Sequence, residues 1–579
     1  MSASMINYHI SYTHPHRHFV SFDAVFPNPE KSTLKIQLPS WRPGRYELGM
    51  FAKNIRNWRA WSSNGQPLSF SKITRDCWEI ESIGESEIRI TYEYYAAELN
   101  AGSTFLDGDQ LYINPVNCFF YISNDHSVPY TLSFELPETY EIACGLRHLN
   151  RHTLSAENFD ELADCPLIAS AALRHLHYTV GQVNFRVSIQ GEHRLDEELL
   201  LRQFESFSRA QIDLFGSFPA DEYHFLFQFT PYFVRHGVEH RNSTVIAMGP
   251  VADFLNENWY ERMLGISSHE LFHTWNVKAI RPIEMQPYRF DQENYSRLGY
   301  VAEGVTTYYG DLILTQSGVM SVGSFLDILS RHFEEHFDNP GRHALSVAES
   351  SFDTWLDGYV NGVPGRKVSI YNEGCLIAWM CDARIRWATQ NKKSLDDVMR
   401  LMNSRFGTTG IGYSESDYFG ILEEVSGVSF SDIRSSLING TGDYSSFLQT
   451  AANQLALQWK IEPVLKWSEA SLGFSLDEGG ARAVVTSVVT DSPGDHAGLW
   501  LDDELITVNG IAPYRNIQQL LRMNSGKEII LGVVRKYKQV EINLREDGKV
   551  WRWKHQLSVD PTADQRSLDA LRAWTSDNL

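Results

Sequence analysis

Apolar and polar residues alternate along several segments of the first third of the chain. The period of two is clearest in three runs: Val20, Phe22, Ala24 and Phe26; Leu34, Ile36 and Leu38; Ile88, Ile90, Tyr92 and Tyr94. Successive side chains of a strand point to opposite faces of a sheet, so this pattern predicts strands with one buried face. Clusters of Pro, Gly, Asn and Ser between the runs favour turns. We therefore expect an antiparallel β domain over residues 1–170.

The period changes in the middle third. DEELLLRQFESFSRAQIDLFG (196–216) and ENYSRLGYVAEGVTTYYGDLIL (293–314) carry apolar residues at helical spacing, which predicts long helices. One β-rich segment, residues 223–249, interrupts them and is expected to form a small sheet beside the helices. We expect a second domain over residues 171–460.

The pattern changes again after about Gln458. Short β-branched runs at 483–489, 505–508 and 528–534 surround one short helical segment, NIQQLLRM, which indicates a small domain over residues 465–548. In the tail, 549–579, TADQRSLDALRAWT predicts an amphipathic helix with Leu568, Leu571 and Trp574 on one side, packing back onto a neighbouring domain. The expected fold class is multidomain α+β.

Composition narrows the classes of protein. At 579 residues the chain is too long for one hydrophobic core, and 43% apolar with 21% charged residues is typical of a soluble globular protein. A net charge of −21 without a cluster of Lys and Arg argues against nucleic acid as a partner. The first residues lack the layout of a secretion signal, and no apolar run approaches the roughly 20 residues of a membrane span. We expect a cytoplasmic protein whose six cysteines are reduced and buried.

The pentapeptide HELFH carries the strongest chemical signal. Residues four apart lie on one face of a helix, so His269 and His273 can bind one metal ion. Glu270 would then stand beside the metal as a general base for a water molecule. The alternative is a buried helix whose histidines are only hydrogen bonded.

A site with two histidines needs a third protein ligand. Glu303 is the candidate, because Leu298, Val301, Val305 and Leu312 around it have helical spacing and would pack that helix against the first. Glu293 is a rival in the polar stretch before this pattern begins. Two imidazoles and one carboxylate leave a coordination position open, as in a catalytic site.

Several segments together resemble a known family. HELFHTWNVKAIRP followed by AEGVTTYY resembles the glycyl aminopeptidase family of zinc metallopeptidases, gluzincins related to aminopeptidase N and thermolysin. SWRPGRY (40–46) is similar to a signature of that family's N-terminal β domain, and LGF with SPGDHAGLWLDDELITVNG resembles its C-terminal PDZ domain. The resemblance implies a thermolysin-like, mainly helical catalytic domain over 171–460 and a PDZ domain over 465–548.

The resemblance also implies roles for individual residues. One Zn²⁺ per chain would be held by His269, His273 and Glu303, with Glu270 as general base. SIYNEG is similar to the segment that supplies the catalytic tyrosine of aminopeptidase N-type enzymes, which makes Tyr371 the expected oxyanion donor. That segment commonly has a lysine where this chain has Glu373, and a core tyrosine is the alternative for Tyr371.

HGVEH (236–240) is similar to a short edge strand that lies along the substrate backbone in these relatives. Glu239 matches the glutamate that binds the free N-terminal ammonium, and Gly237 and Val238 precede it on the strand. A carboxylate there would restrict cleavage to the first residue of an unblocked peptide. His236 departs from the glycine more usual in the family, which puts the expected preference for Gly or Ala in question; a solvated strand residue is the alternative for Glu239.

The PDZ-like segment adds a second expectation. Leu472, Gly473 and Phe474 match the loop whose backbone amides bind a terminal carboxylate. Three roles are open for this domain: it could present peptide substrates, bind a partner peptide, or only pack on the catalytic domain. Three functions follow: a zinc aminopeptidase, which the full set of site residues favours; a PDZ adaptor with an inactive peptidase scaffold; and a zinc endopeptidase, which would not need Glu239.

Overall fold

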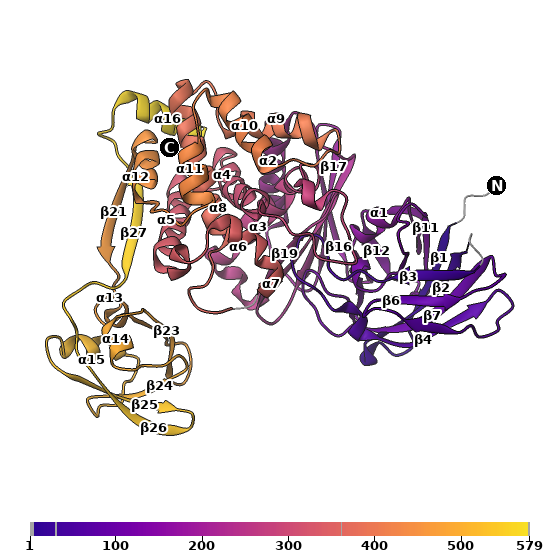
Figure 1. The fold of residues 1–579 in the computed structure, drawn as a ribbon, viewed down its shortest axis with the longest axis horizontal. Coiled ribbons are helices and arrows are strands. Elements are labelled where there is room, and N and C mark those ends of the chain that lie inside the picture. The colour runs from indigo at the N-terminus through magenta and orange to yellow at the C-terminus, as the bar shows by residue number, and fades with distance from the viewer. Residues whose placement is uncertain (1–4, 29–31, 360–361, 577–579) are drawn as a thin grey trace. The chain divides into compact units, whose positions relative to one another are not determined.

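The computed structural model describes residues 5–28, 32–359 and 362–576 of the chain. It divides into two compact units, the first made of residues 1–325, 340–455 and 563–579 and the second of residues 326–339 and 456–562. Figure 1 labels the elements. The chain is multidomain, with a β-rich N-terminal part followed by a region of helices and further sheets.

The N-terminal part of the first unit consists of three sheets. The largest has the strand order β13-β14-β11-β1-β2-β7-β4, and two four-stranded sheets have the orders β10-β3-β6-β5 and β12-β15-β9-β8. Their bounds are β1 Ile6–Ser11, β2 Phe19–Pro27, β3 Thr33–Gln37, β4 Ile55–Ser62, β5 Phe70–Lys72, β6 Cys77–Glu81, β7 Glu87–Tyr95, β8 Phe105–Leu106, β9 Gln110–Ile113, β10 Tyr121–Ile122, β11 Tyr130–Phe134, β12 Glu141–Cys144, β13 Arg147–Asn150, β14 Thr153–Ala156 and β15 Leu167–Ser170.

The alternating runs form strands with one buried face, as predicted. In β2 every second side chain is buried, from Val20 to Phe26, and the same holds in β7 from Ile88 to Tyr94. The expectation of a wholly antiparallel domain was wrong in one place, because β1 pairs with β11 in parallel. A tight hairpin forces two strands to pair antiparallel, whereas strands far apart in the chain, such as β1 and β11, can also pair in parallel.

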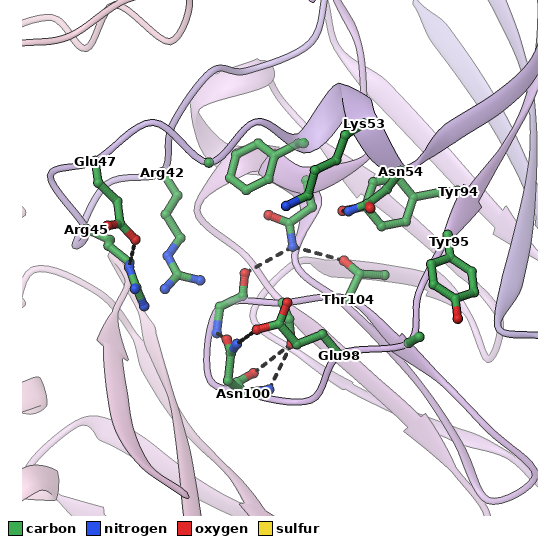
Figure 2. Close-up of a pocket in the computed structure, with 16 residues that line it drawn as sticks. Arg42, Arg45, Glu47, Lys53, Asn54, Tyr94, Tyr95, Glu98, Asn100 and Thr104 are labelled. Carbon is green, nitrogen blue, oxygen red and sulfur yellow. Dashed lines mark hydrogen bonds and ion pairs between the residues drawn. The ribbon is translucent and has the colours of Figure 1, made fainter. Parts of the chain in front are cut away.

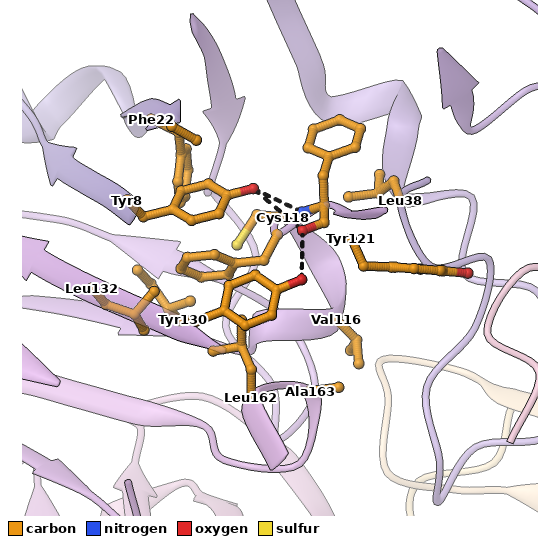
Figure 3. Packing of buried hydrophobic residues seen from close by; sticks show 14 of the residues in the cluster. Tyr8, Phe22, Leu38, Val116, Cys118, Tyr121, Tyr130, Leu132, Leu162 and Ala163 are labelled. Carbon is orange, nitrogen blue, oxygen red and sulfur yellow. Dashed lines mark hydrogen bonds between the residues drawn. The ribbon is translucent and has the colours of Figure 1, made fainter. Parts of the chain in front are cut away.

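Aromatic rings fill the core of this domain (Figure 3). The ring of Tyr8 packs edge to face on Phe119 with centroids 4.7 Å apart. The hydroxyl of Tyr8 accepts a hydrogen bond from the amide of Phe120 at 3.0 Å, and Tyr130 donates to the carbonyl of the same residue at 3.3 Å. The buried hydroxyls are thus paired within the core, as burial of polar groups requires.

A five-stranded sheet follows, with the order β16-β17-β18-β20-β19. Its strands are β16 Arg174–Val180, β17 Val183–Gln190, β18 Glu222–Phe229, β19 Val234–Glu239 and β20 Ser243–Gly249, so the β-rich patch at 223–249 forms a sheet as predicted. An apolar cluster joins this sheet to the sheet of β9, β12 and β15, with Val238 and Val245 packed against Tyr112 and Ile168. Strand β19, which carries HGVE, is at the edge of its sheet.

Helices make up most of the remaining first unit. They are α1 Phe159–Ala163, α2 Glu197–Phe215, α3 Glu257–Phe272, α4 Thr306–Gln316, α5 Val322–Asp338, which continues into the second unit, α6 Val347–Phe352, α7 Thr354–Asp357, α8 Ile370–Thr389, α9 Leu395–Met402, α10 Glu415–Ser426, α11 Ser431–Ile433, α12 Ser445–Gln454 and α16 Gln565–Thr575. Helix α2 is as predicted: the side chain of Asp196 caps its start by accepting from the amide of Leu199, and Gly216 ends it at a φ of 78°.

The helix predicted over residues 293–314 is shorter than expected. The described backbone is irregular from 293 to 298, and a π-helical turn, η6 (Tyr300–Val305), then precedes α4. Apolar periodicity alone does not distinguish an α-turn from a π-turn, since the two differ by one residue in their hydrogen bonds. This π-turn carries Glu303.

The second unit holds two sheets. One pairs β21 (Leu457–Pro463) with β27 (Trp553–Val559), and the other has the order β22-β23-β24-β25-β26. The strands of the latter are β22 Phe474–Asp477, β23 Ala483–Val488, β24 Glu504–Val508, β25 Ile529–Arg535 and β26 Lys538–Leu544, with helices α13 Trp467–Ala470, α14 Pro493–His496 and α15 Ile517–Met523. Strand β27 falls in the segment interpreted from the sequence as a tail.

The last helix of the chain, α16, belongs to the first unit and packs against α4. Leu571 and Trp574 are fully buried, whereas Leu568 is only half-buried. The indole of Trp574 donates to the hydroxyl of Tyr308 at 2.7 Å. The six cysteines are unpaired and buried, as predicted. Among the described residues, none of the helices has the length and apolar character that crossing a bilayer requires.

Candidate active site

Helix α3 positions the histidines of HELFH. His269 is in its last turn and His273 caps its C-terminus, with the amide of His273 donating to the carbonyl of His269 at 3.3 Å. Their Nε2 atoms are 3.0 Å apart. The motif therefore directs two imidazole nitrogens at one point, as its helical spacing predicts.

Glu303 reaches the same point from the π-helical turn η6. Its Oε2 is 3.3 Å from His273 Nε2 and 3.7 Å from His269 Nε2. Ligand atoms of these three residues lie within 4.8 Å of one another, so the group can hold a metal ion. Single π-turns inside α-helices are frequent at functional sites, because the extra residue changes the direction of one side chain. Among the residues that the structure describes, Glu293 is not part of this group.

Hydrogen bonds behind His273 orient its ring. Its Nδ1 is 2.6 Å from the carbonyl oxygen of Asn276, so this nitrogen donates and Nε2 is the ring nitrogen directed at the cluster. The side-chain amide of Asn276 in turn donates to the carbonyl of Val301, at 2.9 Å, and to the hydroxyl of Thr306. These hydrogen bonds, which the sequence did not reveal, connect the end of α3 to η6, the turn that carries Glu303.

Charge around the cluster is concentrated and buried. Burial alone would lower the pKa of His273, but Glu303 and Glu239 raise that pKa to about 10. Burial alone would raise the pKa of Glu303, whereas His273 and His269 lower it to about 2. An anionic carboxylate beside two imidazoles is the donor set expected for a divalent cation.

The carboxylate of Glu270 lies against strand β19, beside Gly237. The residue is 6% exposed, and its Oε2 has no hydrogen-bond partner. A Cβ at Gly237 would fall 2.2 Å from Glu270 Oε1, so only glycine leaves room for this carboxylate. Burial raises the pKa of Glu270 well above its usual value, with Glu239 adding to the effect. A raised pKa suits a group that accepts and later returns a proton.

Glu239 ends strand β19 and is also buried, at 3% exposed, with Oε1 unpaired. Oxygens of Glu239 and Glu270 and a nitrogen of His273 lie within 4.8 Å of one another. Burial raises the pKa of Glu239, and Glu303 adds to it. A Cβ at Gly44 would fall 2.3 Å from Glu239 Oε2, so the N-terminal domain closes directly over this carboxylate.

Strand β19 brings only part of HGVE to the site. Gly237 lines the cavity in front of the histidines, as does His236, whereas the side chain of Val238 is fully buried in the cluster between the two sheets. Burial and then Arg42 and Arg45 lower the pKa of His236 to about 3. His236 is therefore neutral near pH 7 and adds no charge to the cavity.

Tyr371 stands in the first turn of α8. Its ring lies 6.3 Å from that of His269, nearly parallel, and it lines the same cavity. Burial raises the pKa of Tyr371 well above its usual value, with Glu303 adding to the effect, so its hydroxyl keeps its proton. Glu373, which stands where the family commonly has lysine, is buried and hydrogen bonded to Tyr444 instead.

These residues border one cavity of about 470 Å³. A volume of this size suits a small ligand or the end of a peptide. The cavity is lined by Gly44, Arg235, His236, Gly237, Glu239, Gly265, Ile266, His269, Glu270, His273, Glu303, Thr307, Gly310, Asp311 and Tyr371.

Tyr46 is a site residue that the sequence reasoning missed. Its hydroxyl donates to Glu303 Oε1 at 3.1 Å, from a side chain that is 4% exposed. The signal was present in SWRPGRY, but that motif was interpreted only as a mark of the N-terminal domain. Two hydrogen bonds hold this loop in place. The backbone amide of Ser40 donates to the carbonyl of Phe290 at 2.7 Å, and the indole of Trp41 donates to the carbonyl of Arg289 at 2.7 Å.

The loop proposed for a PDZ ligand lies in the second unit. Leu472 and Phe474 are fully buried in its core, and Gly473 has a φ of 71°. The carbonyl of Gly473 accepts from the amide of Val489 at 2.7 Å and from the hydroxyl of Ser492 at 3.4 Å. Both side chains of this loop therefore pack inward.

Comparisons with known proteins show what this chain is similar to. Residues 7–171 match the Peptidase M61 N-terminal domain, and residues 262–377 match the M61 glycyl aminopeptidase domain. The crystal structure of an aminopeptidase N family protein from Idiomarina loihiensis has the same fold, with a TM-score of 0.90, 24% identity and coverage of 99% of this chain and 100% of that one. An M1 zinc metallopeptidase from Deinococcus radiodurans aligns with a TM-score of 0.44 and 14% identity over 78% of this chain and 92% of its own. No curated protein sequence matched the chain.

The chain is therefore an enzyme, a metallopeptidase of the aminopeptidase class. Its resemblance to the M61 glycyl aminopeptidases is confirmed, in both the N-terminal β domain and the segment that carries HELFH, Glu303 and Tyr371.

Proposed function

We propose that the protein is a zinc aminopeptidase that hydrolyses the first peptide bond of unblocked peptides. The observation that carries the proposal is one cavity in which His269, His273 and Glu303 face a second buried carboxylate, Glu239. The first three residues suit a metal ion, and an unpaired carboxylate suits an ammonium group. Their proximity favours reaction at the N-terminal residue.

The three donors fit zinc by their chemistry. Two imidazoles and one carboxylate are a common zinc set, and the Nδ1 donation of His273 to Asn276 leaves the other nitrogen available for the ion. When bound, the ion supplies Lewis acidity, which makes water more acidic and polarises a peptide carbonyl. Tyr46 would hold the second oxygen of Glu303 and keep its carboxylate in one orientation.

Glu270 is the proposed general base. Its unpaired Oε2 is available to take the proton of the attacking water, and its raised pKa lets it return that proton to the leaving amine. Gly237 leaves the space that this carboxylate occupies. General base catalysis of this kind typically contributes about 10²- to 10⁴-fold to the rate.

Tyr371 is the proposed donor to the oxyanion that forms on the peptide carbonyl. It faces the cavity beside His269, and its raised pKa keeps the hydroxyl protonated over the working range of the enzyme. A hydrogen-bond donor placed where negative charge develops typically lowers the activation free energy by about 3 kcal/mol.

Glu239 would bind the substrate ammonium, and β19 would align the peptide. An edge strand has one row of backbone groups unpaired within its sheet, so an extended peptide can add beside it at Gly237. The buried carboxylate of Glu239 gains most from a cation that is itself shielded from water. We propose Gly or Ala as the preferred first residue, with His236 and Gly44 limiting the space around that position.

We further propose that the five-stranded sheet of the second unit is a PDZ domain. Its edge strand β22 follows Leu472 and Gly473, which supports a peptide site at that loop. Helix α13 packs against both β22 and α15, and Gln518 of α15 donates to the hydroxyl of Ser468 at 3.2 Å. A peptide that adds to β22 would have to displace α13. Binding of a fluorescent C-terminal peptide library to wild type and to Gln518→Ala tests this, with tighter binding expected for the variant.

Hydrolysis of Gly- and Ala-p-nitroanilide by the zinc-loaded protein tests the main proposal, with the N-acetylated substrates alongside. We expect cleavage only of the free-amine substrates. Cleavage of the acetylated ones would indicate an endopeptidase, and no cleavage of either would support the adaptor function instead.

The isosteric variant Glu239→Gln sharpens the assignment of the ammonium site. Loss of a buried charge pair costs about 2–5 kcal/mol, so kcat/KM for Ala-p-nitroanilide should fall roughly 30-fold or more. Arg17→Gln, an exposed change in the N-terminal domain, is the control and should have no effect. Equal kinetics for wild type and Glu239→Gln would remove Glu239 from the site.

A further inference from the structure

A second cavity lies in the N-terminal domain and is lined in part by Arg42 and Arg45 of the SWRPGRY loop (Figure 2). Its volume is about 400 Å³, within the range of ligand pockets, and it shares no described lining residue with the active-site cavity. Its polar wall includes Arg42, Arg45, Lys53, Glu98 and Asn100. Three cations stand out in a chain whose net charge is −21.

Arg42 is the central feature of this cavity. It is only 6% exposed, its Nε has no hydrogen-bond partner, and it forms no ion pair with any residue in the described ranges. Its guanidinium lies beside Gly102, where a residue with a Cβ would leave it no room. Burial lowers the pKa of Arg42 to about 10, so the group still carries its charge at neutral pH.

The other charges of the cavity differ in how they are compensated. Arg45 forms an ion pair with Glu47. Glu98 accepts a hydrogen bond from the side-chain amide of Asn100 at 2.7 Å. Lys53 is exposed, and its ammonium has no ion-pair partner in the part of the chain that the structure describes. Figure 2 shows the side chains of Lys53 and Arg42 directed into the same space. Two cations without an ion-pair partner among the described residues therefore face one cavity.

We propose that this cavity binds the carboxylate of a small ligand, with Arg42 as its principal partner and Lys53 as a second. A buried guanidinium without an anion is unfavourable, and its planar donors match a carboxylate. The carboxylate comes either from a free organic acid or from an acidic side chain of a peptide. The site lies apart from the proposed catalytic residues and does not require the proposed function.

The cavity is nevertheless electrically close to the active site. Gly44, between Arg42 and Arg45 in the loop, is the residue that touches Glu239, and both arginines act on His236. The positive charge of Arg42 opposes binding of a substrate ammonium at Glu239. A carboxylate bound at Arg42 would cancel that charge, so we expect it to lower KM for free-amine substrates a few-fold at low salt.

Calorimetric titration of the full-length, metal-free protein with glutarate tests the proposal. We expect binding that the neutral diamide glutaramide does not show, and a Kd about tenfold or more higher for Arg42→Gln. Lys53→Gln, an exposed position, should weaken binding less, and Arg17→Gln should leave it unchanged. Thermal midpoints of all variants show that each is folded; if Arg42→Gln is not, Lys53→Gln and Arg42→Lys carry the comparison.

Binding of acetyl-Ala-Glu-amide and of acetyl-Ala-Gln-amide distinguishes the two sources of the carboxylate, since the peptides differ only in the side-chain carboxylate. The acetyl group removes the free ammonium that Glu239 would bind. Arg42-dependent binding of glutarate alone indicates a free organic acid, and Arg42-dependent preference for the Glu peptide indicates a peptide side chain. Absence of binding for both, or binding that Arg42→Gln does not weaken, overturns the proposal. Either result is independent of whether Ala-p-nitroanilide is hydrolysed.

Discussion

Gly304 and Gly374 lie in contact where η6 meets α8: a Cβ on Gly304 would fall 2.2 Å from the Cα of Gly374. Gly304 follows Glu303 in η6, and Gly374 is in the first turn of α8, three residues after Tyr371. Two helices that approach this closely need glycine at both positions. The contact therefore sets the distance between the proposed third metal ligand and the proposed oxyanion donor.

Gly304→Ala should separate η6 from α8 and weaken the site. Forcing a methyl group into close-packed backbone costs about 1–3 kcal/mol, and we expect a lower thermal midpoint together with weaker zinc binding. Isothermal titration with zinc and thermal unfolding measure both. Gly420→Ala is the matched control, because a Cβ at Gly420 of α10 meets nothing within 4 Å. If Gly304→Ala binds zinc as wild type does, the contact is not what positions Glu303.

Glu270→Gln should abolish turnover while leaving the metal in place. The amide cannot accept the proton of the attacking water, so kcat should fall about 10²- to 10⁴-fold, whereas the three proposed ligands are unchanged. Zinc content by atomic emission and kcat on Ala-p-nitroanilide are the measurements. A variant that lost its zinc as well would show that Glu270 belongs to the metal set.

Tyr46→Phe and Tyr371→Phe should have different effects, although each removes a single hydroxyl. Tyr46 donates to Glu303, so its loss should weaken zinc binding about 10- to 100-fold, as outer hydrogen bonds of metal ligands do. Loss of the Tyr371 hydroxyl should lower kcat about 10²-fold with zinc affinity kept. Identical behaviour of the two variants would contradict the separate roles.

Asp164 and Lys278 form a buried ion pair of 2.8 Å, with His240 against the same carboxylate at 3.1 Å. Lys278→Met leaves that carboxylate uncompensated and should destabilise the first unit by about 3–5 kcal/mol. Lys393→Met, which removes an exposed pair with Asp397, should cost less than about 1 kcal/mol. The midpoints of thermal unfolding of the two variants measure this difference. Similar midpoints for Lys278→Met and Lys393→Met would mean that water reaches the carboxylate of Asp164.

The same carboxylate predicts a dependence on pH. Burial alone would raise the pKa of Asp164, but Lys278 and His240 lower it to about 2, below the value of about 3.9 in an unfolded chain. Its stabilisation is therefore complete above about pH 4 and is lost as the pH falls toward 2. The difference in thermal midpoint between wild type and Asp164→Asn should be constant from pH 8 to 5 and narrow below pH 4. A difference that grows in acid would refute this linkage.

The spacing of residues along the sequence was enough to predict the features that depend only on residues close together in the chain. Alternation identified β2 and β7, because strand faces repeat every two residues. The spacing of His269 and His273 was enough to place both on one helix face. Glu303 was reached by helical spacing and by resemblance, although the π-turn that directs it leaves no mark in apolar periodicity.

Tertiary structure decided what depends on residues far apart in sequence. Tyr46 bonds Glu303 across 257 positions, and Gly44 closes over Glu239 from another domain. Val238 turns into the core while Gly237 admits Glu270. Such contacts are set by how sheets and helices pack, and a single sequence carries only its local periodicities. The amino-acid sequence by itself determined which side chains can bind a metal and move a proton. The packing of the domains determined that these side chains meet, and that Arg42 of the SWRPGRY loop is buried without an ion-pair partner among the described residues.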